Sequence, residues 1–220
     1  MLLPLVTALF SLTVSAINLA LWDIQLPDGS AGHLYSASLI LSQGNPRFTN
    51  VSGNLVFITP PNGVPTSGSS YPRTELRQMA PGGSNAAWKV NDGLTHKLSV
   101  TLRVDSFPWV VQSRLSLLRC LGQGAELMLR VYQTGVVKLF NNFPSAVHSV
   151  QLESGYTVGQ FISASIAPDA TGTTVVSYTN LGSGVSKQIT TTVDATQTYY
   201  FKTGSYCQCS ATDSGVCQVP

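Results

Sequence analysis

Apolar and polar residues alternate along most of the chain after position 97. In the segment 97–104, lysine, serine, threonine and arginine alternate with leucine and valine. A period of two places successive side chains on opposite faces of a strand, so the pattern predicts a strand with one buried and one solvated face, as in antiparallel sheets. The same pattern predicts further strands over 126–132, 136–140, 147–152, 161–167, 173–179, 187–193 and 198–206.

Short turn segments rich in glycine, asparagine and aspartate separate these strands, for example 133–135 and 169–172. No window of helical length keeps a 3.6-residue period, although 113–119 is compatible with a short helical turn. The polar stretch 60–70 lies between two predicted strands, so we interpret it as a rim loop and not as a domain boundary. Many evenly spaced short strands predict an all-β domain, a sandwich or jelly roll of two antiparallel sheets.

Charge is sparse in this chain of 220 residues. Charged residues make up 10% of the sequence, against about 25% in a typical soluble protein. The net charge of +2 lacks the basic excess of nucleic-acid-binding proteins, and 43% hydrophobic residues argue against disorder. In such a chain, a local cluster of charged residues is informative about function.

The first sixteen residues predict a secretory signal peptide. They are apolar and uncharged, and they end in Val14-Ser15-Ala16, which fits the small-x-small rule for cleavage. The run is shorter than the about 20 apolar residues of a membrane span. A buried N-terminal strand is the alternative. We therefore expect 1–16 to be removed and 17–220 to form one extracellular, monomeric domain with no membrane contact.

Four cysteines remain after residue 16, and three of them cluster near the C-terminus: Cys207, Cys209 and Cys217, with Cys120 further upstream. Four cysteines allow three pairings, of which a short bridge from Cys207 or Cys209 to Cys217 is the favoured one. A zinc site is the alternative, but no histidine lies near the cluster. We expect no metal. The triplet 50–52 is an N-glycosylation sequon, which agrees with export.

The segment 71–79 holds the informative cluster. Strand parity places Arg73, Glu75 and Arg77 on one face. Two guanidinium groups flank one carboxylate, so we expect Glu75 to hold both arginines while the face stays positive. Guanidinium groups bind carboxylates in bidentate fashion, which predicts an anionic ligand. A ladder of salt bridges on a solvated face is the alternative.

The segment 199–208 shows a second polar face. Tyr200, Lys202, Gly204, Tyr206 and Gln208 share one side by parity. Glycine inside a strand permits close approach of a ligand. A cation beside a phenol favours its ionised form, so a tyrosine here is a candidate general base or acid. An exposed edge strand with ordinary side chains is the alternative.

These two segments closely resemble the signature strands of a known family. Tyr-Pro-Arg-Thr-Glu-Leu-Arg (71–77) and Tyr-Phe-Lys-Thr-Gly-Ser-Tyr-Cys-Gln (200–208) are similar to motifs of the alginate lyases of polysaccharide lyase family 7 and of the related fungal glucuronan lyases. The resemblance spans most of the chain after residue 16. It implies a β-jelly roll of two stacked antiparallel sheets, with a concave sheet as substrate cleft and no cofactor.

The resemblance also implies a reaction: β-elimination in an acidic, 1,4-linked polyuronate such as alginate or glucuronan. The proton on C5 is removed and the oxygen on C4 is expelled, which requires that the neighbouring carboxylate be neutralised. By this resemblance Arg73 and Gln112 hold the carboxylate, and Tyr206 transfers the proton. The positions implied to bind substrate are Arg77, Lys202, Gln208 and Glu75.

One family motif, Gln-Ile-His or Gln-Val-His, lacks its histidine in this chain. Gln112 is the candidate glutamine, with Ser113-Arg114 in place of Ile-His, and Gln123 is a second candidate. The chain also stops soon after the second motif, where family members usually have another strand. A gene-model error around 109–123 and a truncated C-terminus would account for these departures.

The missing histidine bears on the substrate. In mannuronate and glucuronate, the C5 proton and the C4 oxygen lie on the same side, so one tyrosine can serve as base and acid. In guluronate they lie on opposite faces, and a second group is wanted. We therefore expect mannuronate- or glucuronate-type bonds to be favoured. The alternative is a catalytically impaired paralogue that acts as a polyuronate-binding module.

Overall fold

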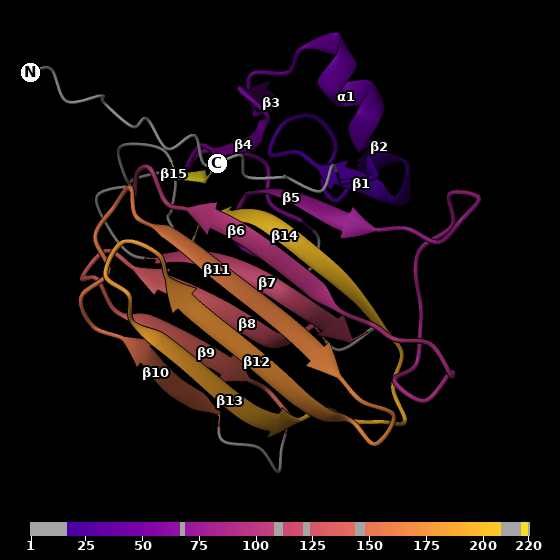
Figure 1. Cartoon of the computed structure of the whole chain (residues 1–220). Helices are drawn as coiled ribbons and strands as arrows, with labels where there is room; N and C mark the ends of the chain where they lie inside the picture. The colour runs from indigo at the N-terminus through magenta and orange to yellow at the C-terminus, as the bar shows by residue number, and fades with distance from the viewer. Residues whose placement is uncertain are drawn as a thin grey trace, which may run out of the picture.

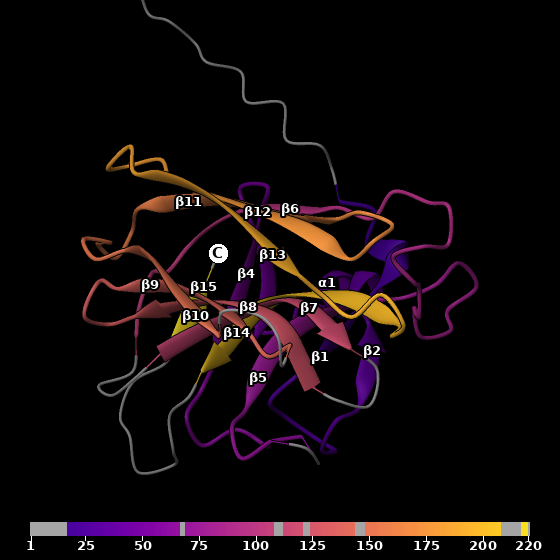
Figure 2. The ribbon, with the colours of Figure 1, turned by 90° about the horizontal axis from the view of Figure 1, so that it is seen from below.

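Two antiparallel sheets stack face to face in this computed structural model (Figures 1 and 2). The structure describes residues 17–66, 69–107, 112–120, 124–143, 148–207 and 217–219. For 112–120, 124–126, 207 and 217–219 it describes the course of the backbone only. The predicted signal peptide, Cys209 and the predicted disulfide therefore lie outside what the structure describes.

The larger sheet has eight strands in the order β10-β9-β8-β7-β14-β5-β1-β2. Its strands are β1 (Trp22–Gln25), β2 (Leu34–Ser36), β5 (Arg73–Gln78), β7 (Gln112–Cys120), β8 (Gly124–Tyr132), β9 (Val137–Asn141), β10 (Ser149–Glu153) and β14 (Tyr199–Cys207). The two motif segments, far apart in the sequence, are thus neighbours: β5 pairs with β14. The centre of this sheet carries the candidate chemistry.

The second sheet has the order β13-β12-β11-β6, and a small third sheet has the order β15-β4-β3. Their strands are β6 (Leu98–Arg103), β11 (Phe161–Pro168), β12 (Thr173–Asn180), β13 (Ser186–Thr192), β3 (Phe48–Val51), β4 (Asn54–Thr59) and β15 (Cys217–Val219). The fold is an all-β jelly-roll sandwich, which confirms the fold class expected from the alternating pattern.

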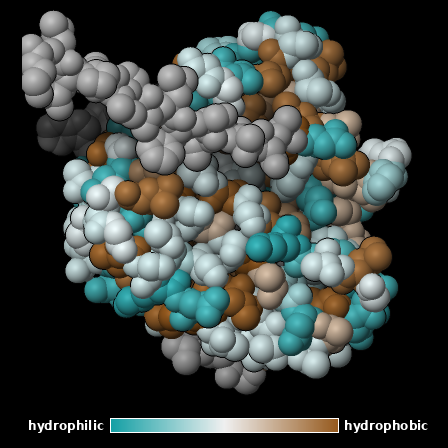
Figure 3. Space-filling view, in the orientation of Figure 1, coloured by the Kyte–Doolittle hydropathy of each residue, from teal (hydrophilic) through white to brown (hydrophobic). Residues whose placement is uncertain are grey.

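The core lies between the eight-stranded and four-stranded sheets. Leu127 and Leu129 of β8 face Ile162 and Ile166 of β11 in one cluster of buried side chains. The intervening residues of β11 and of its neighbours include serines and threonines, such as Ser165 opposite Ser177. They lie on the face turned to the viewer in Figure 3, where pale and teal side chains surround scattered brown ones. Alternation therefore sorts the two faces as expected.

The segment 113–119 is a strand, so the expectation of a helical turn there is wrong. It lies within β7, whose pairing with β8 shifts register between Ser116 and Leu118. Leu115 pairs with Leu129 and Leu118 pairs with Leu127, both core residues. A β-bulge inserts one residue into a strand. Leu115 and Leu118 are three positions apart, a spacing typical of a helix, and the inserted residue lets both pair with core residues of β8.

Helical elements that the sequence reading did not predict are η1 (Leu19–Leu21) and the short helix α1 (Ala37–Gln43). Ser36 caps α1 by accepting from the Leu39 amide, and Gly44 ends it with φ 72° in the left-handed region. These caps are readable locally, but seven residues are too few to establish a period. No helix in the described part of the chain is long and apolar enough to cross a membrane.

A strand does follow the second motif. β15 pairs with β4 and places Cys217 opposite Thr59. This element is short, and no alternating pattern predicted it in the sequence.

Candidate active site

The site is built by the antiparallel pairing of β5 with β14. The register places Arg73 opposite Tyr206, Glu75 opposite Gly204, and Arg77 opposite Lys202. Directly opposed residues in an antiparallel pair share a face. Two sequence motifs thereby become one surface.

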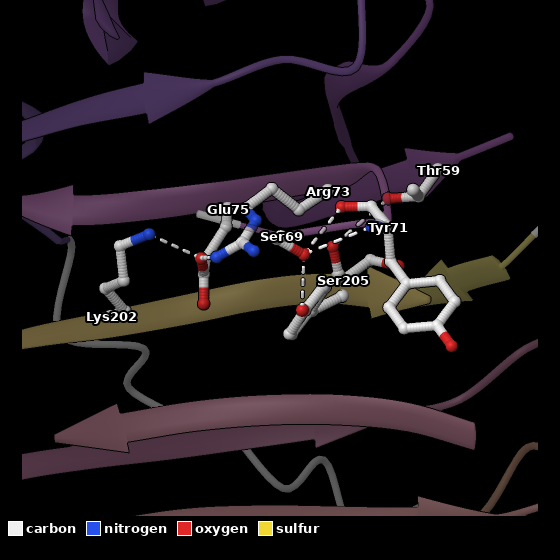
Figure 4. Close-up of polar contacts among 8 residues, drawn as sticks. Thr59, Ser69, Tyr71, Arg73, Glu75, Lys202 and Ser205 are labelled. Carbon is white, nitrogen blue, oxygen red and sulfur yellow. Dashed lines mark hydrogen bonds and ion pairs between the residues drawn. The ribbon is translucent and has the colours of Figure 1, made fainter. Parts of the chain in front are cut away.

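Glu75 forms the centre of this surface. Its side chain is 1% exposed, and its Oε2 lies 2.6 Å from Nζ of Lys202 and 3.4 Å from Nη1 of Arg73 (Figure 4). The sequence predicted that Glu75 would hold both arginines; instead it holds Arg73 and Lys202. Lys202 comes from the neighbouring strand, which only the register brings within reach. A buried ion pair needs such close partners to offset desolvation.

Tyr206 is held by two contacts. The guanidinium carbon of Arg73 lies 4.0 Å from the centroid of its ring. Its hydroxyl lies 2.7 Å from Oγ of Ser69, which belongs to the loop before β5. The phenol is 8% exposed, so its position is tightly determined. Sequence reasoning assigned Ser69 no role; its place in the loop directly before the motif strand was the available signal.

Arg77 lies apart from the Glu75 cluster. Its guanidinium carbon lies 3.9 Å above the ring of Tyr200, and it faces Asp23 across the β1–β5 pair. Burial raises the pKa of Asp23, and the charge of Arg77 opposes that rise. Within the described residues, Nε of both Arg73 and Arg77 is buried without a hydrogen-bond partner.

The sequence suggested that Gly204 permits close approach of a ligand. The structure shows that the backbone itself requires a glycine at this position. Its φ is +142°, and a Cβ there would lie 2.5 Å from the carbonyl oxygen of Thr74. The close approach that this glycine permits is therefore that of β5 itself. Any larger residue would push apart the two strands that form the site.

The register of β7 locates the third motif. Gln112 pairs with Tyr132 of β8, whereas Arg114 pairs with Tyr206. Arg114 thus occupies the strand position beside the tyrosine, where the resemblance leads one to expect the histidine. The structure does not describe the side chains of β7, and Gln208 and Gln123 lie outside the described residues.

The histidines of the chain lie in other environments. His96 stacks on Trp88 at 4.0 Å between ring centroids and lies 3.0 Å from the carboxylate of Asp92. His33 is exposed and packs edge-on against Tyr35. In the part of the chain that the structure describes, no three His, Cys, Asp or Glu residues come together as a metal site would require. The chemistry of the site is that of arginine, lysine and a phenol.

The fold and the family match define the class of protein, a polysaccharide lyase of the β-elimination type. The family model described as alginate lyase matches residues 17–219. This match covers nearly the whole chain, so the protein belongs to the alginate lyase family.

Solved structures agree with this assignment. An alginate lyase from Corynebacterium sp. is 26% identical with a TM-score of 0.74, over 93% of this chain and 92% of that one. An alginate lyase from Pseudomonas aeruginosa is 23% identical with a TM-score of 0.77, over 92% and 96%. A family 7 alginate lyase, A1-II′, solved with substrate, is 23% identical with a TM-score of 0.73, over 92% and 90%. No match was found among curated proteins.

Proposed function

We propose that the protein is a secreted lyase that cleaves 1,4-linked polyuronates by β-elimination, favouring mannuronate-type bonds in alginate or the bonds of glucuronan. The observation that carries the proposal is the contact between Arg73 and Tyr206, a buried guanidinium and a phenol held 4.0 Å apart. One group suits the carboxylate of a uronate and the other suits the proton on the next carbon.

The first task is to neutralise that carboxylate. Loss of the C5 proton spreads a second negative charge onto it, so guanidinium donors stabilise the intermediate more than the substrate. Arg73 has a buried Nε without a partner among the described residues, and Glu75 fixes its other end at Nη1. Gln112 is the second group that we assign to the carboxylate, on the basis of the motif.

The second task is proton transfer. The phenolate oxygen of Tyr206 takes the C5 proton, the C4–O bond breaks, and a C4=C5 double bond forms. The phenol then gives this proton to the departing C4 oxygen, which returns the tyrosine to its starting state. Ser69 can donate a hydrogen bond to the ionised oxygen at 2.7 Å, and Arg73 places a positive charge over the ring.

The bond preference follows from the residue next to Tyr206. Arg114 takes the register position beside it, so this strand supplies no imidazole there. With one tyrosine as base and acid, the proton and the leaving oxygen must lie on the same side of the sugar. Mannuronate and glucuronate meet this condition, and guluronate does not.

The test is cleavage of poly-mannuronate, poly-guluronate and glucuronan. The ultraviolet absorbance of the new double bond measures the product. We expect product from the first and the third, and a loss of about 10²- to 10⁴-fold in Tyr206→Phe with polymer binding retained. A preference for poly-guluronate would contradict the bond assignment. Binding without product by the native protein would instead support a polyuronate-binding module.

Export is part of the proposal and is tested separately. It is supported by the apolar segment 1–16 that ends in a small-x-small site. The full chain expressed in its source cell should accumulate in the medium with Ile17 as its first residue. Retention in the cell with Met1 intact would refute this part alone.

A further inference from the structure

The face that carries Tyr206 continues across β7 to β8 and β9. Cross-strand pairs run from Tyr206 to Arg114, from Arg114 to Arg130, and from Arg130 to Lys138. On β8 and β9 the alternate residues, such as Leu129 and Leu139, are buried in the core. Arg130 and Lys138 therefore lie on the opposite face, in the same transverse row as the phenol.

Among the described residues, no carboxylate pairs with Arg130 or Lys138. The guanidinium carbon of Arg130 lies 3.7 Å above the ring of Phe140, and Nζ of Lys138 lies 5.7 Å from the ring centroid of Tyr132. Neither forms an ion pair among the described residues, and Nε of Arg130 is buried there without a hydrogen-bond partner. Aromatic rings hold the two cations in place, and no described residue compensates their charge.

Arg103 is an arginine of this chain whose charge is compensated by a carboxylate. It too lies over an aromatic ring, that of Phe161, at 5.0 Å. Unlike Arg130, it donates through Nε to Asp105 at 2.6 Å. Arg103 belongs to β6 in the other sheet. The same stacked geometry thus has an internal anion at Arg103 and, among the described residues, none at Arg130.

The pairing of Arg130 with Lys138 has a cost. Like charges directly opposite each other in a sheet are destabilising, and these two are direct partners. In a chain with only 12 basic residues, such an arrangement is expected where an external anion binds between the charges. At an exposed position elsewhere in the chain, either side chain would avoid this repulsion.

We infer that Arg130 and Lys138 form a carboxylate-binding subsite for the polyuronate, two to three sugars from the cleaved bond. Neighbouring strands are about 4.8 Å apart, so β8 lies about 10 Å and β9 about 14 Å from Tyr206 on β14. One strand spacing is close to the length of one sugar in an extended 1,4-linked chain. A polymer laid across the strands from Arg73 would reach these cations with its later carboxylates.

This inference rests on the proposed function, and a binding assay separates the two. Affinity for oligomannuronates from disaccharide to octasaccharide is measured by calorimetry in a Tyr206→Phe background, which does not cleave. We expect affinity to rise with length until the chain reaches β9. Arg130→Gln/Lys138→Gln should lose this rise, about 10-fold for the longest ligands, and bind the disaccharide unchanged. Arg103→Gln is the matched control and should keep the full rise.

Two further readouts exclude a structural role. The melting temperature of the double variant should equal or exceed that of the parent, because repulsion between like charges is removed. In the cleaving protein, the variant should raise KM for polymer about 10-fold with kcat unchanged. An unchanged length dependence would overturn the subsite while leaving the lyase proposal intact. Loss of binding in a protein that never yields product would instead refute the lyase proposal and keep the subsite.

Discussion

Two buried glutamates occupy different surroundings in this small protein. Glu75 lies between Arg73 and Lys202, on the face of the eight-stranded sheet that carries Tyr206. Glu153, at the end of β10, is 6% exposed and is surrounded by neutral donors. The Tyr178 hydroxyl donates to its Oε2, Asn180 Nδ2 lies 3.0 Å from both of its oxygens, and Ser183 Oγ donates to Oε1 at 3.0 Å.

The two sets of partners differ in charge: those of Glu75 are cationic, and those of Glu153 are neutral and support the scaffold. Cations around Glu75 keep positive charge at the surface where an anionic polymer would bind. Hydroxyl and amide groups around Glu153 satisfy its oxygens without adding charge, and they connect the edge of the large sheet to β12. Both solutions offset the desolvation of a carboxylate. Only the first includes positively charged side chains.

Glu75→Gln should have the largest effect. It leaves Arg73 and Lys202 buried without their counter-charge, so the free energy of unfolding should fall by about 3–5 kcal/mol. Cleavage should fall by about 10²-fold or more, because Arg73 loses its anchor. Urea unfolding and initial rates measure the two effects. Adding Lys202→Gln should recover part of the stability, and a single variant as stable as the native protein would break the comparison.

Glu153→Gln should affect stability alone. One carboxylate oxygen becomes an amide nitrogen that faces the donors of Tyr178 and Asn180, which should lower the free energy of unfolding by about 1–3 kcal/mol. The rate per folded molecule should stay unchanged, since three strands lie between β10 and β14. The same urea curves and rates test this. A catalytic loss at full folding would show that the two regions are not independent.

Tyr178→Phe tests the surroundings of Glu153 through the pH dependence of stability. Burial, followed by the hydrogen bond to Glu153, raises the pKa of Tyr178 above its ordinary 10.0. The folded state then keeps a proton that the unfolded state releases, so stability falls as pH rises above 10.0. The variant should lose about 1 kcal/mol at neutral pH and show a shallower alkaline decline. An equal decline in variant and native protein would contradict the assignment.

Asp23→Asn should give the smallest effect. Burial raises the pKa of Asp23 above 3.8, and Arg77 opposes this only partly. The ionised form is therefore disfavoured by folding, and the variant should be slightly more stable at neutral pH and no different below pH 3.8. Asp169→Asn is the matched control with opposite sign, because hydrogen bonds from Thr171 lower the pKa of Asp169. Thermal melts at both pH values distinguish the two variants.

The alternating pattern determined the fold class because strand parity is a local property. Each predicted strand from 97 onward matches an observed one within a few residues, since burial on one face requires a period of two. The pattern failed at β7, where a bulge shifts the register between Ser116 and Leu118. A period cannot be read across an inserted residue.

The sequence alone also predicted which residues carry the chemistry, through two ordered motifs around Arg73 and Tyr206. The sequence did not determine which of these residues are in contact with one another. The partner of Glu75 proved to be Lys202, the close contact of Gly204 proved to be Thr74, and Ser69 proved to reach Tyr206. Each is a contact between segments far apart in the chain. Parity fixes the face of a side chain, but only strand order and register, set when the whole sandwich closes, fix its neighbour.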